Sequence, residues 1–333
     1  MTPLVSILIP AYNAEPWLGD AIRSALDQTW THTEIIVVND GSKDRTLEVA
    51  NQYASAKVRV LTHDNQGASA TRNRALREAQ GDYIQWLDAD DILDRKKVAC
   101  QLARTDHDNT VLLSSAWARY YYRRHKAVFS HNELCRDHTS LSWMQTRMET
   151  KAWMAIESWL VSRHLAEKAG PWDTSLSADD DGEYFARIVY ACSHIRYIPE
   201  ARSLCRLANP NSLSKGIRTS YWLESKFKSL QKQISYLRSL DDSQRSRQAG
   251  LVLLQHCFGY FYPDRKDIVA VCQVLAQELG GSLYAPKLRS KYHWLTPVIG
   301  WDHAKTIQNT LPHFRSWFSC TWDHALYQLE RWV

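Results

Sequence analysis

The 333-residue sequence lacks several patterns that would assign it to a common class. Its seven cysteines form no CxxC pair and have no zinc-like spacing with histidine, which argues against a structural zinc site or a disulfide framework. Neither GxGxxG nor GxxxxGK[ST] occurs, so no dinucleotide motif or P-loop explains phosphate binding. No apolar run approaches the ~20 residues that cross a bilayer, and residues 1–9 are too short for a signal peptide. We therefore expect a cytoplasmic protein with reduced thiols.

The composition is that of a globular protein. Apolar residues make up 44% of the chain, which is ample material for a packed core. The net charge of +5 is modest and spread along the chain, so we do not expect nucleic acid as a partner.

Strand and helix patterns alternate in the first hundred residues. Apolar runs at residues 5–9 and 34–39 indicate strands buried on both faces, and residues 58–62 and 83–87 are predicted as the third and fourth strands. Residues 17–28, 44–54 and 69–79 have helical spacing. This alternation predicts an α/β fold with a mostly parallel, doubly wound sheet flanked by helices. In such sheets, ligands bind beyond the carboxyl ends of the strands.

The fourth strand ends in a group of acids. Residues 83–93 read YIQWLDADDIL, so Asp88, Asp90 and Asp91 follow an apolar run directly. Two carboxylates one residue apart can hold Mg²⁺ or Mn²⁺, which prefer oxygen ligands. The alternative is a polar loop or a helix cap, where aspartate is common. On this stretch alone, both interpretations stand.

The other strand ends offer complementary groups. Tyr12 follows the first strand and could stack on a nucleobase, and Asp40 follows the second and could accept hydrogen bonds from one. Asp88 and Asp90 would then lie near a diphosphate. Asp40 could equally belong to a strand-to-helix turn, and Arg72 could pair with Asp40 or Glu78 for structural reasons alone.

The later chain is less regular. We expect helices at 96–105, 162–168 and 183–190 and strands at 111–115 and 195–198, while the segment up to about residue 148 stays unassigned. From about residue 219 the pattern is helical, and apolar residues recur at intervals of three and four through 223–237. One helix packing against the preceding domain is favoured over a coiled-coil interface.

The last fifty residues are rich in tryptophan. Residues 283–333 hold five tryptophans and four histidines. This mixture suits either a membrane interface or an aromatic core, and we favour the core.

Residues 4–94 resemble glycosyltransferase family 2 through four motifs in order: VSILIPAYN, EIIVVNDGSKDRT, NQGASATRNRA and GDYIQWLDADD. A looser match runs through GPWDTSLSADDDGEYFARI. The resemblance implies a GT-A fold with a helical C-terminal extension. We expect a catalytic domain at 1–218, divided into a nucleotide-binding half (1–95) and an acceptor half (96–218), and a mainly helical region at 219–333.

The resemblance also implies a reaction: inverting transfer of a sugar from a UDP- or dTDP-sugar to a hydroxyl of a saccharide or lipid-linked acceptor. The product would be a bacterial cell-surface polysaccharide or glycolipid, and the cofactor Mn²⁺ or Mg²⁺. Peripheral contact with the inner face of the membrane, through the C-terminal region, is included in this expectation. The oligomeric state is not predicted.

The matching motifs assign roles to individual residues. The residues expected to bind the nucleotide sugar are Pro10, Tyr12, Asn13, Asp40, Arg72, Asp88 and Ala89. The metal ligands would be Asp88 and Asp90, with Asp90 the more direct. The general base would be Asp181, or Asp180 if the motif is shifted by one position.

The sequence departs from the family in one stretch. The family often has a histidine where residues 205–214 read CRLANPNSLS, so the resemblance identifies no third protein ligand for the metal. The motif of processive synthases is also missing, which favours single sugar transfer. Two other functions remain open: a nucleotide-sugar-binding protein without catalysis, and a sugar-1-phosphate nucleotidyltransferase.

Overall fold

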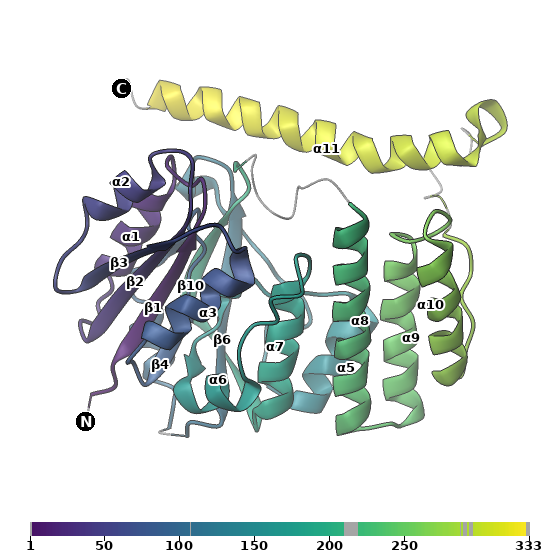
Figure 1. The fold of residues 1–333 in the computed structure, drawn as a ribbon, viewed down its shortest axis with the longest axis horizontal. Coiled ribbons are helices and arrows are strands. Elements are labelled where there is room, and N and C mark those ends of the chain that lie inside the picture. Colours follow the sequence, from purple (N-terminus) through teal and green to yellow (C-terminus); the bar gives the residue numbers. More distant parts are fainter. Residues whose placement is uncertain are drawn as a thin grey trace.

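The computed structural model describes residues 2–106, 108–209, 219–286, 288, 292 and 296–330. Figure 1 shows strands and their covering helices on one side, a row of helices on the other, and one long helix across the top. The predicted α/β class and the helical C-terminal part are confirmed.

The first sheet has the strand order β3-β2-β1-β4-β9. Its four parallel strands are the four that the sequence predicts, and β9 adds an antiparallel edge. The strands are β1 (Val5–Ala11), β2 (Thr33–Asp40), β3 (Val58–His63), β4 (Tyr83–Trp86) and β9 (Val161–Ser162). The intervening helices are α1 (Leu18–Leu26), α2 (Thr46–Asn51) and α3 (Ala68–Glu78).

Both faces of this sheet are covered, which explains the continuous apolar runs. Along β1, Leu8 belongs to the core cluster that contains Trp86, whereas Ile7 and Ile9 belong to the cluster on the opposite face, and all three are fully buried. A strand with one solvated face would instead have alternated apolar and polar residues.

The second sheet has the order β5-β10-β6-β7, with β8 paired to β10. Its strands are β5 (Ile92–Leu93), β6 (Val111–Tyr120), β7 (Val128–Phe129), β8 (His138–Thr139) and β10 (His194–Arg206). Both expected strands of this half are longer than predicted. The extra length of β10 matters for function because Leu204 pairs with Ile92, so the end of β10 lies beside the acidic stretch after β4.

The remaining helices of this half are α4 (Lys97–Leu102), α5 (Ser140–Thr150), α6 (Arg163–Ala169) and α7 (Asp180–Ala191). Helix α5 falls in the segment that the sequence left unassigned. Its buried side includes Gln145 and Thr146 beside Trp143 and Met144, so the apolar periodicity is interrupted.

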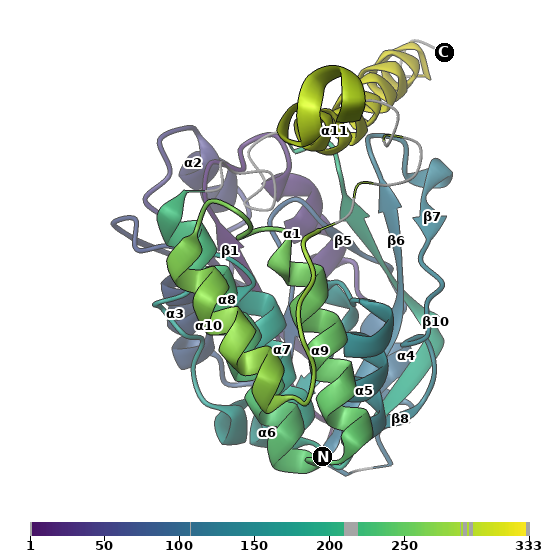
Figure 2. The ribbon, with the colours of Figure 1, turned by 90° about the vertical axis from the view of Figure 1, so that its right-hand side faces the viewer.

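The C-terminal helices are α8 (Ser220–Leu240), α9 (Gln244–Phe258), α10 (Lys266–Glu278) and α11 (Thr296–Glu330). Phe227, Leu230, Ile234 and Leu237 of α8 are buried, and α8 runs beside α7 (Figure 2). Packing against the preceding domain, the favoured interpretation, is therefore confirmed.

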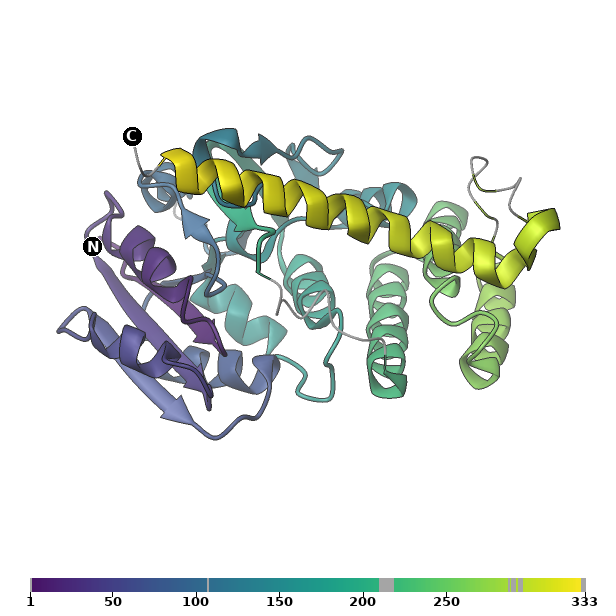
Figure 3. The same ribbon diagram turned by 90° about the horizontal axis from the view of Figure 1, so that it is seen from above.

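Helix α11 extends along the whole molecule (Figure 3). Its last part is fixed where β6 ends: His324 stacks on Tyr122 with ring centroids 4.3 Å apart, and Arg123 Nε donates to Asp323 Oδ1 at 2.8 Å. The expected aromatic core is wrong for Trp317 and Trp322, which are 60% and 61% exposed; the side chains of the other three tryptophans lie outside the described residues. Within the described ranges, none of the helices combines the length and hydropathy that crossing a bilayer requires.

Candidate active site

The loops after β1 and β2 are tied together by Asn13. Its backbone N–H donates to Ser42 Oγ at 3.0 Å, and its Oδ1 accepts the backbone N–H of Lys43 at 2.9 Å. Asn13 has a φ of 47°, a left-handed conformation that asparagine tolerates better than most residues. The adjacent Tyr12 is 46% exposed, so its ring is available to a ligand.

Asp40 holds the loop before α3. Its carboxylate is almost fully buried and accepts the backbone N–H groups of Gln66 at 2.7 Å and Gly67 at 3.0 Å. The backbone after Asp40 approaches that of Asn65 closely, which needs glycine at position 41. There φ is 63°, and a Cβ would lie 2.7 Å from the backbone nitrogen of Asn65. The structural role of Asp40 is therefore visible, and its contact with a base stays a prediction.

Arg72 of α3 joins two acidic segments that are far apart in the sequence. Its Nη1 donates to Asp180 Oδ2 at 2.8 Å and its Nη2 to Asp88 Oδ1 at 3.2 Å. Burial alone would lower the pKa of Arg72, but the charges of these two carboxylates outweigh it and raise the pKa. The expected alternative, pairing with Asp40 or Glu78, is wrong, because Glu78 pairs with Arg59 and Arg74 instead.

Aromatic packing supports the position of Arg72. Its Cζ lies 4.5 Å from the ring centroid of Trp172, which stacks on Tyr184 at 4.0 Å. Asn73 fixes the backbone of Trp172 with two hydrogen bonds of 2.8 Å, one donated and one accepted. The Arg72-Asn73 pair thus links α3 to the turn that precedes α7, and α3 cannot move without moving the second acidic segment.

Asp88, Asp90 and Asp91 form what we call the first acidic cluster. The side chain of Asp88 is 35% exposed. Asp90 Oδ2 accepts Asn209 Nδ2 at 2.8 Å, and its pKa is raised by burial and by the charge of Asp88. Two close carboxylates with too little positive charge fit a hard divalent cation, which would offset their repulsion. Asp88 and Asp90 are thus suited to hold Mg²⁺ or Mn²⁺.

Asp91 faces the interior instead. Its Oδ1 accepts the backbone N–H of Arg206 at 2.6 Å, and among the described residues its oxygens group with Glu157 and Cys205, with ligand atoms within 4.8 Å. This group is a second candidate for a cation. However, burial raises the pKa of Glu157 to about 8 and that of Asp91 well above its usual range, so a proton shared between the two carboxyls explains their closeness.

Asp179, Asp180 and Asp181 form the second acidic cluster. Asp179 pairs with Lys226 of α8 at 2.9 Å; burial would raise its pKa, but the charges of Lys226 and Arg147 lower it. Asp180 is bound to Arg72. Asp181 has no cation within ion-pair distance in the described ranges, and burial together with Asp180 and Asp179 raises its pKa to about 6.

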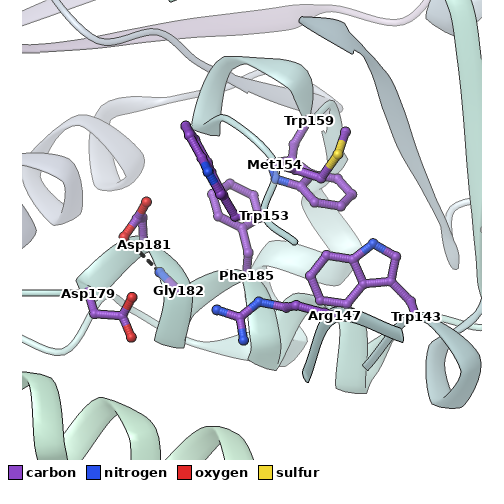
Figure 4. Close-up of a pocket in the computed structure, with 9 residues that line it drawn as sticks. All are labelled: Trp143, Arg147, Trp153, Met154, Trp159, Asp179, Asp181, Gly182 and Phe185. Carbon is purple, nitrogen blue, oxygen red and sulfur yellow. Dashed lines mark hydrogen bonds between the residues drawn. The ribbon is translucent and has the colours of Figure 1, made fainter. Parts of the chain in front are cut away.

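A cavity of about 130 Å³ opens beside Asp181 (Figure 4). Aromatic side chains from α5, from residues 151–159 and from α7 surround it: Trp143, Trp153, Trp159 and Phe185. One basic residue, Arg147 of α5, also lines it. An ionisable carboxylate thus faces an apolar hollow with a cation at its edge.

The structure brings most of the predicted site residues together. Tyr12, Asn13, Asp40, Asp88, Ala89 and Asp90 lie at or just beyond the ends of parallel strands, Pro10 lies within β1, and Arg72 connects them to Asp180. Sequence reasoning missed Lys226, Glu157 and Asn209. Asn209 alone had a signal, since it lies in the stretch where the resemblance expects a histidine.

Comparison with solved structures identifies the fold. A structure of residues 1–349 of TarS from S. aureus in complex with UDP-GlcNAc is similar with a TM-score of 0.61 and 16% identity, covering 86% of this chain and 94% of that one. A complex of the same TarS fragment with UDP gives a TM-score of 0.59, with 88% of this chain and 78% of that one covered. The chain therefore has the GT-A fold of glycosyltransferases.

Sequence comparison matches part of the chain to a known family. Residues 6–158 match the model described as glycosyl transferase family 2. EpsJ of Bacillus subtilis, an uncharacterized glycosyltransferase, is 28% identical over 65% of this chain, and TuaG of the same organism, a putative teichuronic acid biosynthesis glycosyltransferase, is 42% identical over 30%. The chain spans 64% of the length of EpsJ and 41% of that of TuaG. Residues 6–158 thus match a glycosyltransferase family 2 domain.

Proposed function

We propose that this chain is a metal-dependent, inverting hexosyltransferase that moves a sugar from a UDP- or dTDP-sugar to a saccharide or lipid-linked acceptor. The observation that carries the proposal is the bridge from Asp88 through Arg72 to Asp180, which joins a nucleotide-type strand edge to the acidic segment whose Asp181 lines the cavity. The UDP and UDP-GlcNAc complexes of TarS support the donor class. The name of TuaG supports a cell-surface polysaccharide as product.

On the donor side, Tyr12 would stack on the base and Asp40 would face its N–H, while Pro10, Asn13 and Ala89 frame the nucleotide. Arg72 and Asp88 would lie at the diphosphate. Asp88 and Asp90 would hold Mn²⁺ or Mg²⁺, which when bound neutralises the leaving diphosphate. The amide of Asn209, already in contact with Asp90, is our candidate for a third ligand, since asparagine also offers an oxygen.

On the acceptor side, we assign the general base to Asp181 and not to Asp180. Asp180 is bound by Arg72, whereas Asp181 has no ion pair in the described ranges and accepts only the backbone N–H of Gly182 there, at 2.8 Å. Its pKa of about 6 suits a base at neutral pH. Asp181 would take the proton of the acceptor hydroxyl as its oxygen bonds to C1 of the donor sugar. The bond from C1 to the diphosphate breaks at the same time, and the nucleoside diphosphate leaves with the electron pair.

We also propose that the enzyme works in the cytoplasm at the inner face of the membrane. The exposed side of α11 carries Trp317, Phe318, Trp322 and Leu329, each at least 60% exposed. Such a face suits the interfacial region of a bilayer. Sedimentation with anionic lipid vesicles should carry the wild-type protein down and leave a Trp317→Ser/Trp322→Ser variant in solution; equal sedimentation would contradict membrane contact through this face.

The central experiment is a screen of nucleotide sugars for hydrolysis in Mn²⁺ and in chelator. We expect metal-dependent release of one nucleoside diphosphate, lost in Asp90→Ala and in Asp181→Ala. Full activity in both variants would refute the assignment. Calorimetry with UDP separates the remaining alternative, because binding without turnover on any donor or acceptor would favour a non-catalytic binding protein.

A further inference from the structure

Arg147 of α5 is a cation at the wall of the cavity. Its Nη1 is shielded from solvent, and its side chain makes no hydrogen bond or ion pair with any residue in the described part of the chain. Leaving a shielded guanidinium nitrogen without an acceptor costs free energy, and guanidinium donors suit carboxylate and phosphate oxygens. An anion from outside the chain would supply what the fold does not.

Asp179 does not fill this role. It is close enough for the charge of Arg147 to help lower its pKa, but its oxygens are already engaged by Lys226 at 2.9 Å, Ser229 at 2.8 Å and Gln233 at 2.7 Å. The carboxylate is thus held by groups of α8, and Arg147 acts on it only through the longer-range attraction of its charge.

The cavity next to Arg147 has the size and the walls for a sugar. Since about 10–15 Å³ by this measure admits one water, a volume of about 130 Å³ matches a single sugar unit better than a chain. Trp153 forms one wall; its ring is 41% exposed, lies 4.4 Å from that of Trp117, and has Arg119 at 5.0 Å. A ring supported in this way offers a flat apolar surface to the carbon face of a sugar.

Figure 4 shows the groups that an occupant would meet: Asp181 on one side, Arg147 below, and Trp153 and Phe185 above Arg147. We propose that this cavity selects an anionic acceptor, a sugar unit that carries a carboxylate or a phosphate, with the anion on Arg147, the ring on Trp153 and the reacting hydroxyl toward Asp181. This inference rests on the proposed function and adds the class of acceptor to it.

The test uses the full chain with UDP and Mn²⁺ and three probes: methyl β-D-glucuronide, methyl β-D-glucoside and methyl β-D-glucoside 6-phosphate. Ligand-observed NMR titrations give their affinities. We expect one or both anionic probes to bind at least about tenfold more tightly than the neutral one, the usual effect of a hydrogen bond to a charged group. Comparing the affinities of the glucuronide and the 6-phosphate shows whether the cavity prefers a carboxylate or a phosphate.

Variants locate the effect. Arg147→Gln should remove the preference for the anion, Arg147→Lys should keep part of it, and Trp153→Ala should weaken all probes alike. Arg245→Gln is the matched control, since Arg245 is an exposed arginine that pairs with Glu149 of the same helix as Arg147. The melting temperature of Arg147→Gln should stay close to that of the wild type, because the change removes only the longer-range attraction to Asp179 and no hydrogen bond or ion pair within the described residues.

Equal binding of neutral and anionic probes, no binding of either anionic probe, or a clearly lower melting temperature for Arg147→Gln would overturn the inference. UDP affinity and donor hydrolysis, measured on the same samples, keep this result apart from the proposed function. Donor hydrolysis without preference for an anion refutes the inference alone. Failure to bind UDP refutes the proposed function.

Discussion

The two acidic clusters each contain three aspartates within four residues, and in each cluster the surroundings give the three carboxyls three different states. In the first, Asp88 is partly exposed beside Arg72, Asp90 meets Asn209, and Asp91 points inward toward Glu157. In the second, the ion pairs among the described residues go to Asp179 and Asp180, and Asp181 has none there.

This difference indicates a division of labour. The first cluster concentrates negative charge where a divalent cation would relieve it, whereas the second removes competing partners from one carboxyl and raises its pKa into the range of a general base. Arg72 contacts both clusters and so sets their spacing.

The largest effect should come from Asp181→Asn. A general base contributes about 10²–10⁴-fold to the rate, so donor hydrolysis should fall by about that factor while UDP affinity stays unchanged. Stopped assays of nucleoside diphosphate release and calorimetry measure the two quantities. Asp173→Asn is the control, because Asp173 lies at a turn and pairs with Lys232; a similar loss in both variants would argue against a special role for Asp181.

The next effect concerns the bridge. Arg72→Met leaves Asp88 and Asp180 without their cation, and we expect a loss of about 3–5 kcal/mol in the free energy of unfolding, measured with urea. Arg59→Met is the matched control; its pair with Glu78 is partly exposed, so we expect a loss of about 1 kcal/mol or less.

A double-mutant cycle sharpens this result. If Arg72 acts through the second acidic cluster, Asp180→Asn should lower the free energy of unfolding much less in the Arg72→Met background than in the wild type. Additive losses would mean that Arg72 stabilises the fold through its stacking on Trp172 and not through the bridge.

The third effect separates neighbours within the first acidic cluster. Asp90→Asn should weaken UDP binding in Mn²⁺ by about 10- to 100-fold, the cost of losing a charged contact, whereas Asp91→Asn should leave it nearly unchanged. Calorimetry with and without Mn²⁺ measures both. The reverse order would place the cation in the buried group of Asp91, Glu157 and Cys205.

The sequence was sufficient to predict the first sheet and the strand-end positions of the site. Strands buried on both faces leave unbroken apolar runs, and the polar residue after each run marks a carboxyl end, as at Asp40 and Asp88. The partner of each carboxyl was not predictable, because it lies far away in the sequence: Arg72 and Asp180 are 108 residues apart.

Other features had no sequence signal at all. Lys226 belongs to a helix whose apolar repeat predicted packing but not an ion pair with Asp179. Arg147 lies in the segment that could not be assigned, since polar side chains buried in α5 interrupt its pattern, and Trp153 follows just after it. The acceptor side of the site therefore required the three-dimensional structure.

The fourth prediction concerns the pH dependence of the rate. Because the base must be ionised and the pKa of Asp181 is about 6, kcat/KM for donor hydrolysis should fall about tenfold per pH unit below pH 6. Asp180→Asn removes a negative neighbour and frees Arg72, so the midpoint should move to lower pH. A midpoint that is the same in both proteins would exclude Asp181 as the titrating group.

The smallest effect is on stability. The pKa of Asp181 rises from its usual value of 3.8 to about 6 on folding, so its favourable contribution is complete below pH 3.8 and is lost as pH rises through 6. Asp181→Asn removes this loss. We expect a higher melting temperature than wild type at pH 7.5, by about 2–4 °C for each kcal/mol recovered, and a smaller difference at pH 4. The opposite result is a gain in melting temperature over wild type that is smaller at pH 7.5 than at pH 4. It would show that the ionised Asp181 is well solvated and that its environment does not destabilise the folded protein.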